Sequence, residues 1–439
     1  MAKRKRAEIA TNGQTGQDQP RKAVKSATAT SELPENDPGA VTIQVVTGSY
    51  QSVLHGFTVT LPAEPPSDKK KEDAPSTLRF ADTFLFQAHT SAIRTLALSP
   101  PTNTDSSQPQ TAILATGGSD ERINLYSISM APPMVSERYP SVSTLAGNKI
   151  LENPKNREIG TLLHHSSSIT TLYFPSKSKL LSAAEDNTIS VTRIRDWNVV
   201  STVKAPQPKA QGRPTGDTAP PGSVPCGIND FAVHPSMKLM ISVGRGERCM
   251  RLWNLMTGKK AGVLNFDKEL LQSVKENKRS TGEGRGIVWD NAGEEFAIAF
   301  EWGVVVFGID STPRCKAIPS PTTKVQRVKY ADFSKDKDGS KELLTISTDD
   351  GRVLFYSTKE TSASSDSSTI PDAQLIKENT SEGLSSTLLG SYETGNRITC
   401  MVAFVMQKPQ DLEAINESDL GSDEEEEAAP EESSDSDQD

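Results

Sequence analysis

Cysteine and histidine are scarce in this sequence, which has four residues of the first type and five of the second among 439. Cys226, Cys249, Cys315 and Cys400 stand far apart and form no Cys-x-x-Cys pair, so the sequence offers no zinc-binding pattern. We interpret these cysteines as buried thiols in a reducing compartment, and we expect neither a metal nor a cofactor.

Long hydrophobic runs and catalytic motifs are also missing. No apolar stretch approaches the ~18 residues of a membrane span, and no hydrophobic segment follows the basic N-terminus as it would in a secretory signal. A nucleophile elbow, a phosphate-binding P-loop and a His-Glu-x-x-His zinc motif are absent from the sequence. These absences predict a soluble intracellular protein that is not an enzyme and does not bind a membrane.

Charge is concentrated at the two ends of the sequence. The formal net charge is -9, yet residues 423–439 hold ten Asp or Glu and no Lys or Arg, and the remainder has a net charge of +1. The first 25 residues are basic instead, through Lys3, Arg4, Lys5, Arg6, Arg21 and Lys22. Blocks of one sign are typical of disordered interaction tails. We therefore predict a disordered basic tail over residues 1–40 and a disordered acidic tail over residues 406–439.

Between the tails, short runs of β-branched and aromatic residues recur, separated by turn residues. A strand-rich stretch at 41–87 is followed by five repeats, each with two apolar strands, a tight turn and an alternating strand, and several with a fourth short strand. In the first repeat these strands are AIRTLALS (92–99), AILATGG (112–118) and INLYSI (123–128). Four short antiparallel strands per unit are the signature of a propeller blade. The sequence therefore predicts an all-β fold, a WD40-type β-propeller over residues 41–405.

Each repeat carries an acidic residue in the tight turn between its second and third strands. These acids are Asp120, Asp186, Glu247, Glu301 and Asp350. A carboxylate in such a turn can accept hydrogen bonds from backbone N–H groups that the turn leaves unpaired. The small residues before the acid let neighbouring blades approach closely. We interpret all five acids as parts of the turn architecture and none as catalytic.

The number of blades follows from the repeats and from the need to close the ring. A closed ring leaves no blade face open, so we expect the strand at 397–405 to join the strands of 41–87 in one composite blade. Five repeats and this composite give six blades, although seven is the commoner number. The alternative is that one repeat is missing between Leu389 and Arg397. Long polar insertions, such as 131–158, 205–224 and 357–386, account for the wide spacing of the repeats.

Particular phrases of the sequence resemble one family. They include VTGSYQSVLHGFTV (46–59), FQAHTSAIRTLALS (86–99) and VHPSMKLMISVGRGERCMRLWNLMTGKKAGVL (233–264). These phrases are similar to the nucleolar WD-repeat family of the maintenance-of-killer ribosome assembly factor and the PAK-interacting protein, and the resemblance covers roughly residues 41–405. It implies a propeller whose usual number of blades is seven. It also gives His89 and His165 the place of the histidine that precedes the opening strand of a blade in this family.

The same resemblance implies a function. It implies a non-catalytic scaffold in the nucleolus that acts in assembly of the large (60S) ribosomal subunit and in precursor rRNA maturation, with pre-60S proteins and rRNA as partners. The alternative is a signalling adaptor that binds the regulatory segment of a p21-activated-type protein kinase and restrains the kinase. A third hypothesis is a chromatin-type peptide reader with a pocket at the central channel of the ring.

Both tails carry sequence signals of their own. The cluster at Lys3, Arg4, Lys5 and Arg6, with Arg21 and Lys22 downstream, resembles a nuclear import signal, whose partner would be the acidic groove of an import receptor. Ser422, Ser434 and Ser436 lie among acidic residues and suit an acidophilic kinase, and phosphorylation would deepen the negative charge of the tail.

Overall fold

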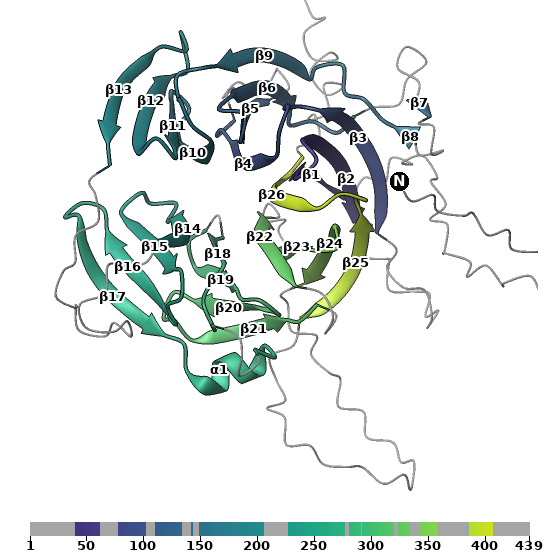
Figure 1. Ribbon diagram of the computed structural model, residues 1–439. Coiled ribbons are helices and arrows are strands. Elements are labelled where there is room, and N and C mark those ends of the chain that lie inside the picture. The colour runs from purple at the N-terminus through teal and green to yellow at the C-terminus, as the bar shows by residue number, and fades with distance from the viewer. Residues whose placement is uncertain are drawn as a thin grey trace, which may run out of the picture.

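Six β-sheets arranged around a central axis make up the fold. The computed structural model describes residues 40–61, 78–101, 110–133, 142–143, 149–205, 227–276, 281–290, 292–319, 324–332, 342–357 and 386–406. The sheets follow one another as the blades of a propeller (Figure 1), and one short helix, α1 (Lys268–Ser273), lies between the third and the fourth blade in the sequence. The predicted all-β propeller with six blades is confirmed.

Five blades are built from four strands in chain order, and in blade 1 the short strands β7 and β8 of another sheet come before the fourth strand. Blade 1 holds β4 (Ile93–Leu98), β5 (Thr111–Gly118), β6 (Ile123–Ser129) and β9 (Arg157–Leu162). Blade 2 holds β10 (Ile169–Ser176), β11 (Lys179–Ala184), β12 (Thr188–Arg193) and β13 (Val199–Lys204). Blade 3 holds β14 (Ile228–Val233), β15 (Leu239–Gly244), β16 (Cys249–Asn254) and β17 (Lys259–Asn265). Blade 4 holds β18 (Gly286–Trp289), β19 (Glu295–Ala299), β20 (Val304–Gly308) and β21 (Pro313–Ala317). Blade 5 holds β22 (Val325–Asp332), β23 (Glu342–Thr348), β24 (Arg352–Ser357) and β25 (Thr387–Glu393).

The sixth blade, here the closing blade, combines strands from both ends of the described chain. β26 (Ile398–Val405) pairs antiparallel with β1 (Val41–Ser49), so that Val402 lies opposite Val46. β2 (Val53–Leu61) and β3 (Arg79–Gln87) complete the four strands, as the sequence predicts. Two short strands, β8 (Lys149–Ile150) and β7 (Val142–Ser143), extend this sheet beyond β3 through a parallel pair between Asp82 and Ile150.

The segment in which a further repeat could be missing forms the outer strand of blade 5. Residues Thr387–Glu393 pair antiparallel with β24, and Leu354 lies opposite Ser391. After a turn of four residues the chain enters β26 of the closing blade. This segment therefore begins in blade 5 and leads directly into the closing blade, with no further repeat between them. The ring has six blades rather than seven.

Shared hydrophobic cores hold neighbouring blades together at five seams. Alternation along each strand points one row of apolar side chains at the preceding blade and the other row at the following blade. One buried residue from each side of these seams, in ring order, is Leu54 with Ile93, Ile123 with Ile169, Val243 with Ile287, Val304 with Leu344, and Val353 with Phe57. In the part of the chain that the structure describes, no such core joins blades 2 and 3.

The structure describes some residues of the predicted tails and some of the cysteines. Residues 1–39 and 407–439 lie outside the described residues, and so does Cys226. Met406 follows β26, donates its N–H to the Thr42 carbonyl oxygen at 2.8 Å and is buried. Cys249, Cys315 and Cys400 are buried in the propeller. No helix among the described residues has the length and hydrophobicity that crossing a membrane would require.

Closure of the ring makes Phe57 a sensitive position. Its side chain is fully buried between blade 5 and the closing blade, and its ring stacks on Tyr392 with 4.2 Å between centroids. We expect Phe57→Ala to lower the free energy of unfolding by about 3–5 kcal/mol, because it leaves a cavity in this core. Urea denaturation followed by circular dichroism measures the change. The control Leu163→Ala, at a side chain that is 70% exposed, changes stability by less than about 0.5 kcal/mol, and equal losses in both variants would contradict a shared core at this seam.

Candidate functional site

The turn of blade 1 combines an acid, a histidine and a hydroxyl. Asp120 follows β5, and its carboxylate lies 2.9 Å from Nδ1 of His89, while Nε2 of the same ring lies 2.7 Å from the Thr116 hydroxyl. The carboxylate also accepts the N–H of Thr90 at 3.0 Å. A Cβ atom on Gly118 would come within 2.6 Å of the His89 ring, so only glycine fits beside this pair. The network ties the loop before β4 to the β5–β6 turn.

Blade 2 repeats the arrangement of blade 1. Asp186 lies 3.2 Å from Nδ1 of His165, whose Nε2 lies 2.8 Å from the Ser182 hydroxyl. Burial alone would raise the pKa of Asp186, but hydrogen bonds from the Thr188 hydroxyl and N–H, from Ser166 N–H and from His165 lower it to about 2. The pKa of Asp120 is also lowered, because hydrogen bonds from Thr90 and His89 outweigh its burial. Both carboxylates are thus ionised and engaged by the turn itself.

The other three turn acids have different partners. Glu247 is buried and pairs with the Arg251 guanidinium, with 2.8 Å between Oε1 and Nη2. Glu301 forms ion pairs with Lys324 and, at 3.4 Å, with Arg285. The N–H groups of Glu301 and Trp302 donate to the Glu276 carboxylate at 2.8 and 3.2 Å, so in this blade an acid from outside the turn accepts them. Asp350 binds the Arg352 side chain at 2.9 Å and accepts the Thr348 hydroxyl.

His164 and His165 form a pair of adjacent histidines in the loop before β10. Their ring centroids are 4.4 Å apart, and Nε2 of His164 lies 2.9 Å from the same Ser182 hydroxyl that contacts His165. Burial, and then the adjacent His165, lower the pKa of His164. Within the described ranges, no group of three or more His, Cys, Asp or Glu side chains could hold a metal ion.

A buried polar cluster joins blade 5 to the closing blade. Nε2 of His55 on β2 lies 2.8 Å from Oδ1 of Asp82 on β3, and the Tyr392 hydroxyl on β25 donates to the same oxygen. His55 and Asp82 are 5% and 7% exposed, so a substrate has no access to the cluster. Burial and the Asp82 carboxylate raise the pKa of Tyr392, which keeps the phenol protonated as the donor. Sequence reasoning missed this cluster, because its members are remote in sequence and no local motif joins them.

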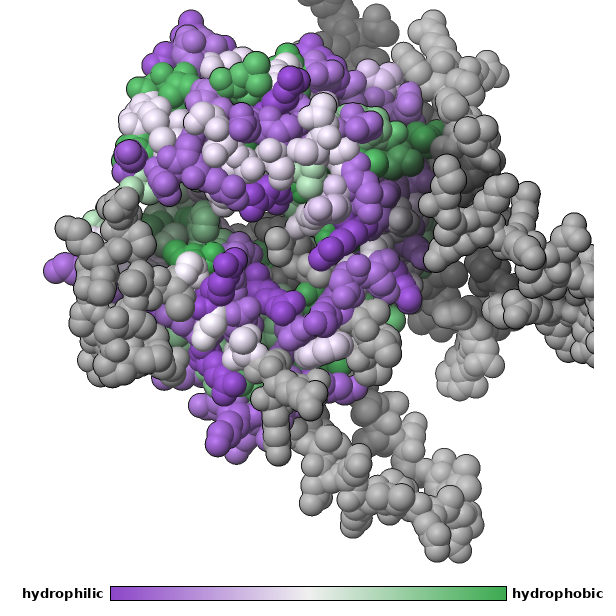
Figure 2. All heavy atoms as spheres, viewed as in Figure 1, coloured by the Kyte–Doolittle hydropathy of each residue, from purple (hydrophilic) through white to green (hydrophobic). Residues whose placement is uncertain are grey.

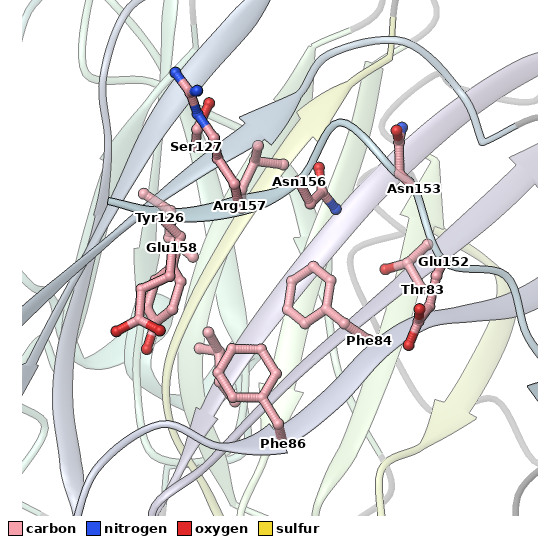
Figure 3. Close-up of a pocket in the computed structure, with 13 residues that line it drawn as sticks. Thr83, Phe84, Phe86, Tyr126, Ser127, Glu152, Asn153, Asn156, Arg157 and Glu158 are labelled. Carbon is pink, nitrogen blue, oxygen red and sulfur yellow. The ribbon is translucent and has the colours of Figure 1, made fainter. Parts of the chain in front are cut away.

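The closing blade and blade 1 enclose a pocket at the outer rim, here the rim pocket. Its volume is about 270 Å³. Phe84 and Phe86 project from β3 toward the loop that carries Asn153 and Asn156 (Figure 3). Tyr126 on β6 closes one side, with its ring 5.5 Å from that of Phe86. Asn156 fixes the loop by accepting the Ser129 N–H at 2.9 Å.

The rim pocket has an aromatic floor and a charged mouth. Phe86 is 39% exposed, and the exposed charged residues Glu152, Arg157 and Glu158 surround it. Burial, and then the negative charge of Glu158, raise the pKa of Tyr126 to about 12, so its hydroxyl stays protonated. A pocket of this size and lining suits one apolar or aromatic side chain of a protein partner. It is the candidate functional site.

Other residues singled out by the sequence lie outside the described residues. They are the basic residues Lys3, Arg4, Lys5, Arg6, Arg21 and Lys22, and the serines Ser422, Ser434 and Ser436.

The lowered pKa of Asp186 predicts a pH-dependent loss of stability in Asp186→Asn. The native pKa of about 2 lies below the usual value of about 3.9 in an unfolded chain, so the ionised carboxylate stabilises the fold above about pH 4. We expect Asp186→Asn to cost about 1–2 kcal/mol at neutral pH, and the difference from the natural chain to shrink as the pH falls from 4 to about 2. Denaturant titrations at several pH values measure it. The exposed control Glu294→Gln shows no such convergence, and a pH-independent difference would contradict the role of the charge.

Comparison with known proteins identifies one repeat and a set of relatives. The family described as "WD domain, G-beta repeat" matches residues 156–192, which run from the outer strand of blade 1 into the third strand of blade 2. Protein MAK11 of Saccharomyces cerevisiae is 28% identical over 334 residues, which cover 72% of this chain and 63% of the relative. The p21-activated protein kinase-interacting protein 1-like of Danio rerio is 26% identical over 314 residues, 72% of this chain and 61% of the relative. Shk1 kinase-binding protein 15 of Schizosaccharomyces pombe is 26% identical over 246 residues, 52% of this chain and 59% of the relative.

The aligned part of this chain spans about three fifths of the length of these curated relatives. Most of each alignment must fall on the propeller, because the described strands occupy residues 41–405. The homologues of this chain thus include Protein MAK11 and the p21-activated protein kinase-interacting protein 1-like proteins, and they support its resemblance to this group of WD-repeat proteins.

Proposed function

We propose that this protein is a non-catalytic scaffold in the nucleolus that acts in assembly of the large (60S) ribosomal subunit and in precursor rRNA maturation. The observation that carries the proposal is the similarity to Protein MAK11 over 72% of the chain. It agrees with the family resemblance in phrases such as 46–59, which implies ribosome assembly.

The structure of the propeller favours a scaffold function over a catalytic one. The histidines and acids that could do chemistry, such as His89 with Asp120 and His55 with Asp82, are held against each other in turns or between blades. The rim pocket offers aromatic contact surface and no nucleophile activated by a base. A rigid ring with contact sites on its rim can hold several partners at fixed positions.

The tails complete the proposed organisation of the chain. Residues 1–40 would bind an import receptor through Lys3, Arg4, Lys5, Arg6, Arg21 and Lys22, and the same cations would contact rRNA phosphates in a salt-dependent way. Residues 406–439 would contact basic ribosomal proteins, and phosphorylation at Ser422, Ser434 and Ser436 would strengthen such contacts. With these roles given to the tails, the propeller over residues 41–405 would bind proteins of the pre-60S particle.

The second candidate function is binding of a protein kinase. Two of the relatives carry it in their names, as a p21-activated protein kinase-interacting protein and as a Shk1 kinase-binding protein. Under this alternative the propeller would hold the regulatory segment of a p21-activated-type kinase and restrain the kinase. Such an adaptor would be independent of ribosomal particles.

Sedimentation separates the two functions. We expect the tagged chain from a nuclear extract to migrate in a sucrose gradient with large-subunit precursors and their rRNA, and to stay there at moderate salt. Phe86→Glu in the rim pocket should weaken binding about thirtyfold and so reduce the co-migrating fraction, because losing an aromatic anchor costs about 2 kcal/mol or more.

The matched control for this experiment is Leu388→Glu, since Leu388 is 51% exposed on β25, away from the rim pocket. The control should migrate like the natural chain. If the natural chain stays at the top of the gradient without rRNA, the assembly function is wrong and kinase binding takes its place. If both variants stay with the particles, the rim pocket is not the contact.

A further inference from the structure

The seam between blades 2 and 3 differs from the other five. The contact that the structure gives across it lies at the inner strands, where the Tyr173 ring on β10 meets Phe231 on β14 at 6.4 Å between centroids. The Tyr173 hydroxyl also reaches the Met237 sulfur at 3.5 Å. Toward the rim the two sheets diverge, and β13 lies well apart from β15 and β16 (Figure 1). In Figure 2 the surface is recessed between these two parts of the ring, and hydrophobic atoms show in the recess.

The exposed fraction of one residue in each repeat indicates how open the seam after that blade is. The apolar residue three positions after each turn acid points at the following blade. In blades 1, 3, 4 and 5 this residue is buried in the next seam, as Ile123, Met250, Val304 and Val353, with at most 3% of its surface exposed. In blade 2 it is Ile189, which is 40% exposed. This position of blade 2 thus carries an apolar residue of the kind that the other blades bury at an interface, and blade 3 does not cover it.

The exposed face of blade 2 is an apolar surface with cations at one end. The register places Ala183, Ile189 and Val203 side by side across three strands, and Val203 is 55% exposed. The next row contains Leu181 and Val191. Farther along the same face, Lys179 lies opposite Arg193, and both are exposed.

The facing surface of blade 3 is aromatic and also carries a cation. Trp253 is half-buried and donates its indole N–H to the Ser242 hydroxyl at 2.8 Å. Lys260 lies opposite Trp253 in the register, and its ammonium nitrogen is buried without a hydrogen-bond partner among the described residues. The acid of this face, Glu247, is already paired with Arg251. A buried ammonium without a partner is unfavourable, and a carboxylate beside it would remove this cost.

We propose that the seam between blades 2 and 3 binds an extended segment of a partner protein that carries both apolar side chains and carboxylates. Its apolar residues would cover Ile189 and Val203, and a carboxylate would pair with Lys260. A nucleic acid would match the cations but leave the apolar rows uncovered, so the observations favour a protein. The site is separate from the rim pocket, and it serves a scaffold of either proposed function.

Peptide binding to the full chain tests the seam directly. The probe is a fluorescein-labelled synthetic peptide that alternates leucine and glutamate, followed by fluorescence anisotropy. We expect saturable binding, and a loss of affinity of about tenfold or more in Val203→Glu and in Lys260→Glu, because each places a negative charge against the peptide carboxylates. Both positions lie on β13 or β17, outside the closed cores, and circular dichroism checks that the variants fold. The matched control is Ile309→Glu, at a residue of blade 4 that is 59% exposed, and it should bind like the natural chain.

Several results would overturn the proposal. Equal binding of a serine–glutamate peptide would mean that charge alone is recognised, and tighter binding of single-stranded RNA at the same residues would assign the seam to nucleic acid. Unchanged affinity in both seam variants, or no saturable binding of the leucine–glutamate peptide, would remove the site. Carbodiimide cross-linking of Lys260 to residues 423–439 of its own chain would show that the chain fills the seam itself.

Discussion

Pairing of β26 with β1 is the interaction on which the rest of the propeller depends. It joins residues about 350 positions apart in the sequence, and it places Val402 beside Val46 and Val405 beside Ile43. Each blade can bury only one apolar face on each neighbour. The first and the last blade would therefore each leave a face uncovered if the ends of the chain did not meet. β25 and β26 follow one another across the last seam, where Phe57, Tyr392 and Phe355 pack and where His55 and the Tyr392 hydroxyl both bind the Asp82 carboxylate.

The turn acids show that one position in a repeat can solve the same problem in different ways. In blades 1 and 2 the acid binds a histidine from the preceding loop, which in turn contacts a hydroxyl of the second strand. In blade 3 an arginine four residues later takes the place of the histidine. In blade 4 the carboxylate that accepts the turn N–H groups comes from Glu276, after α1. Each of these turns needs a partner for the charge of its acid and an acceptor for its unpaired N–H groups. The residue that supplies them varies from blade to blade.

The two surface sites differ in how the ring produces them. The rim pocket lies between β3 and the loop before β9, at a seam whose inner part is closed by a shared core. The seam between blades 2 and 3 lacks a shared core among the described residues, so that side chains patterned for an interface, above all Ile189, are exposed. A scaffold gains binding surface in this way without inserting a further domain. Both sites combine apolar side chains with charges at their edges, which is the composition expected where protein partners bind.

Local patterns in the sequence determined most of the fold. Alternation and turn residues located the five repeats, the turn acids aligned them, and the need for closure assigned residues 397–405 to the same sheet as 41–87, because these signals act over a few residues or follow from counting strands. The segment around Leu389 was ambiguous, since one apolar run can serve either a repeat of its own or the outer strand of blade 5. The rim pocket, the buried cluster of His55, Asp82 and Tyr392, and the exposure of Ile189 were decided only by the tertiary structure. Each depends on which side chains of distant strands meet, and how closely, and a pattern that repeats in every blade carries no information about the seam at which the blades diverge.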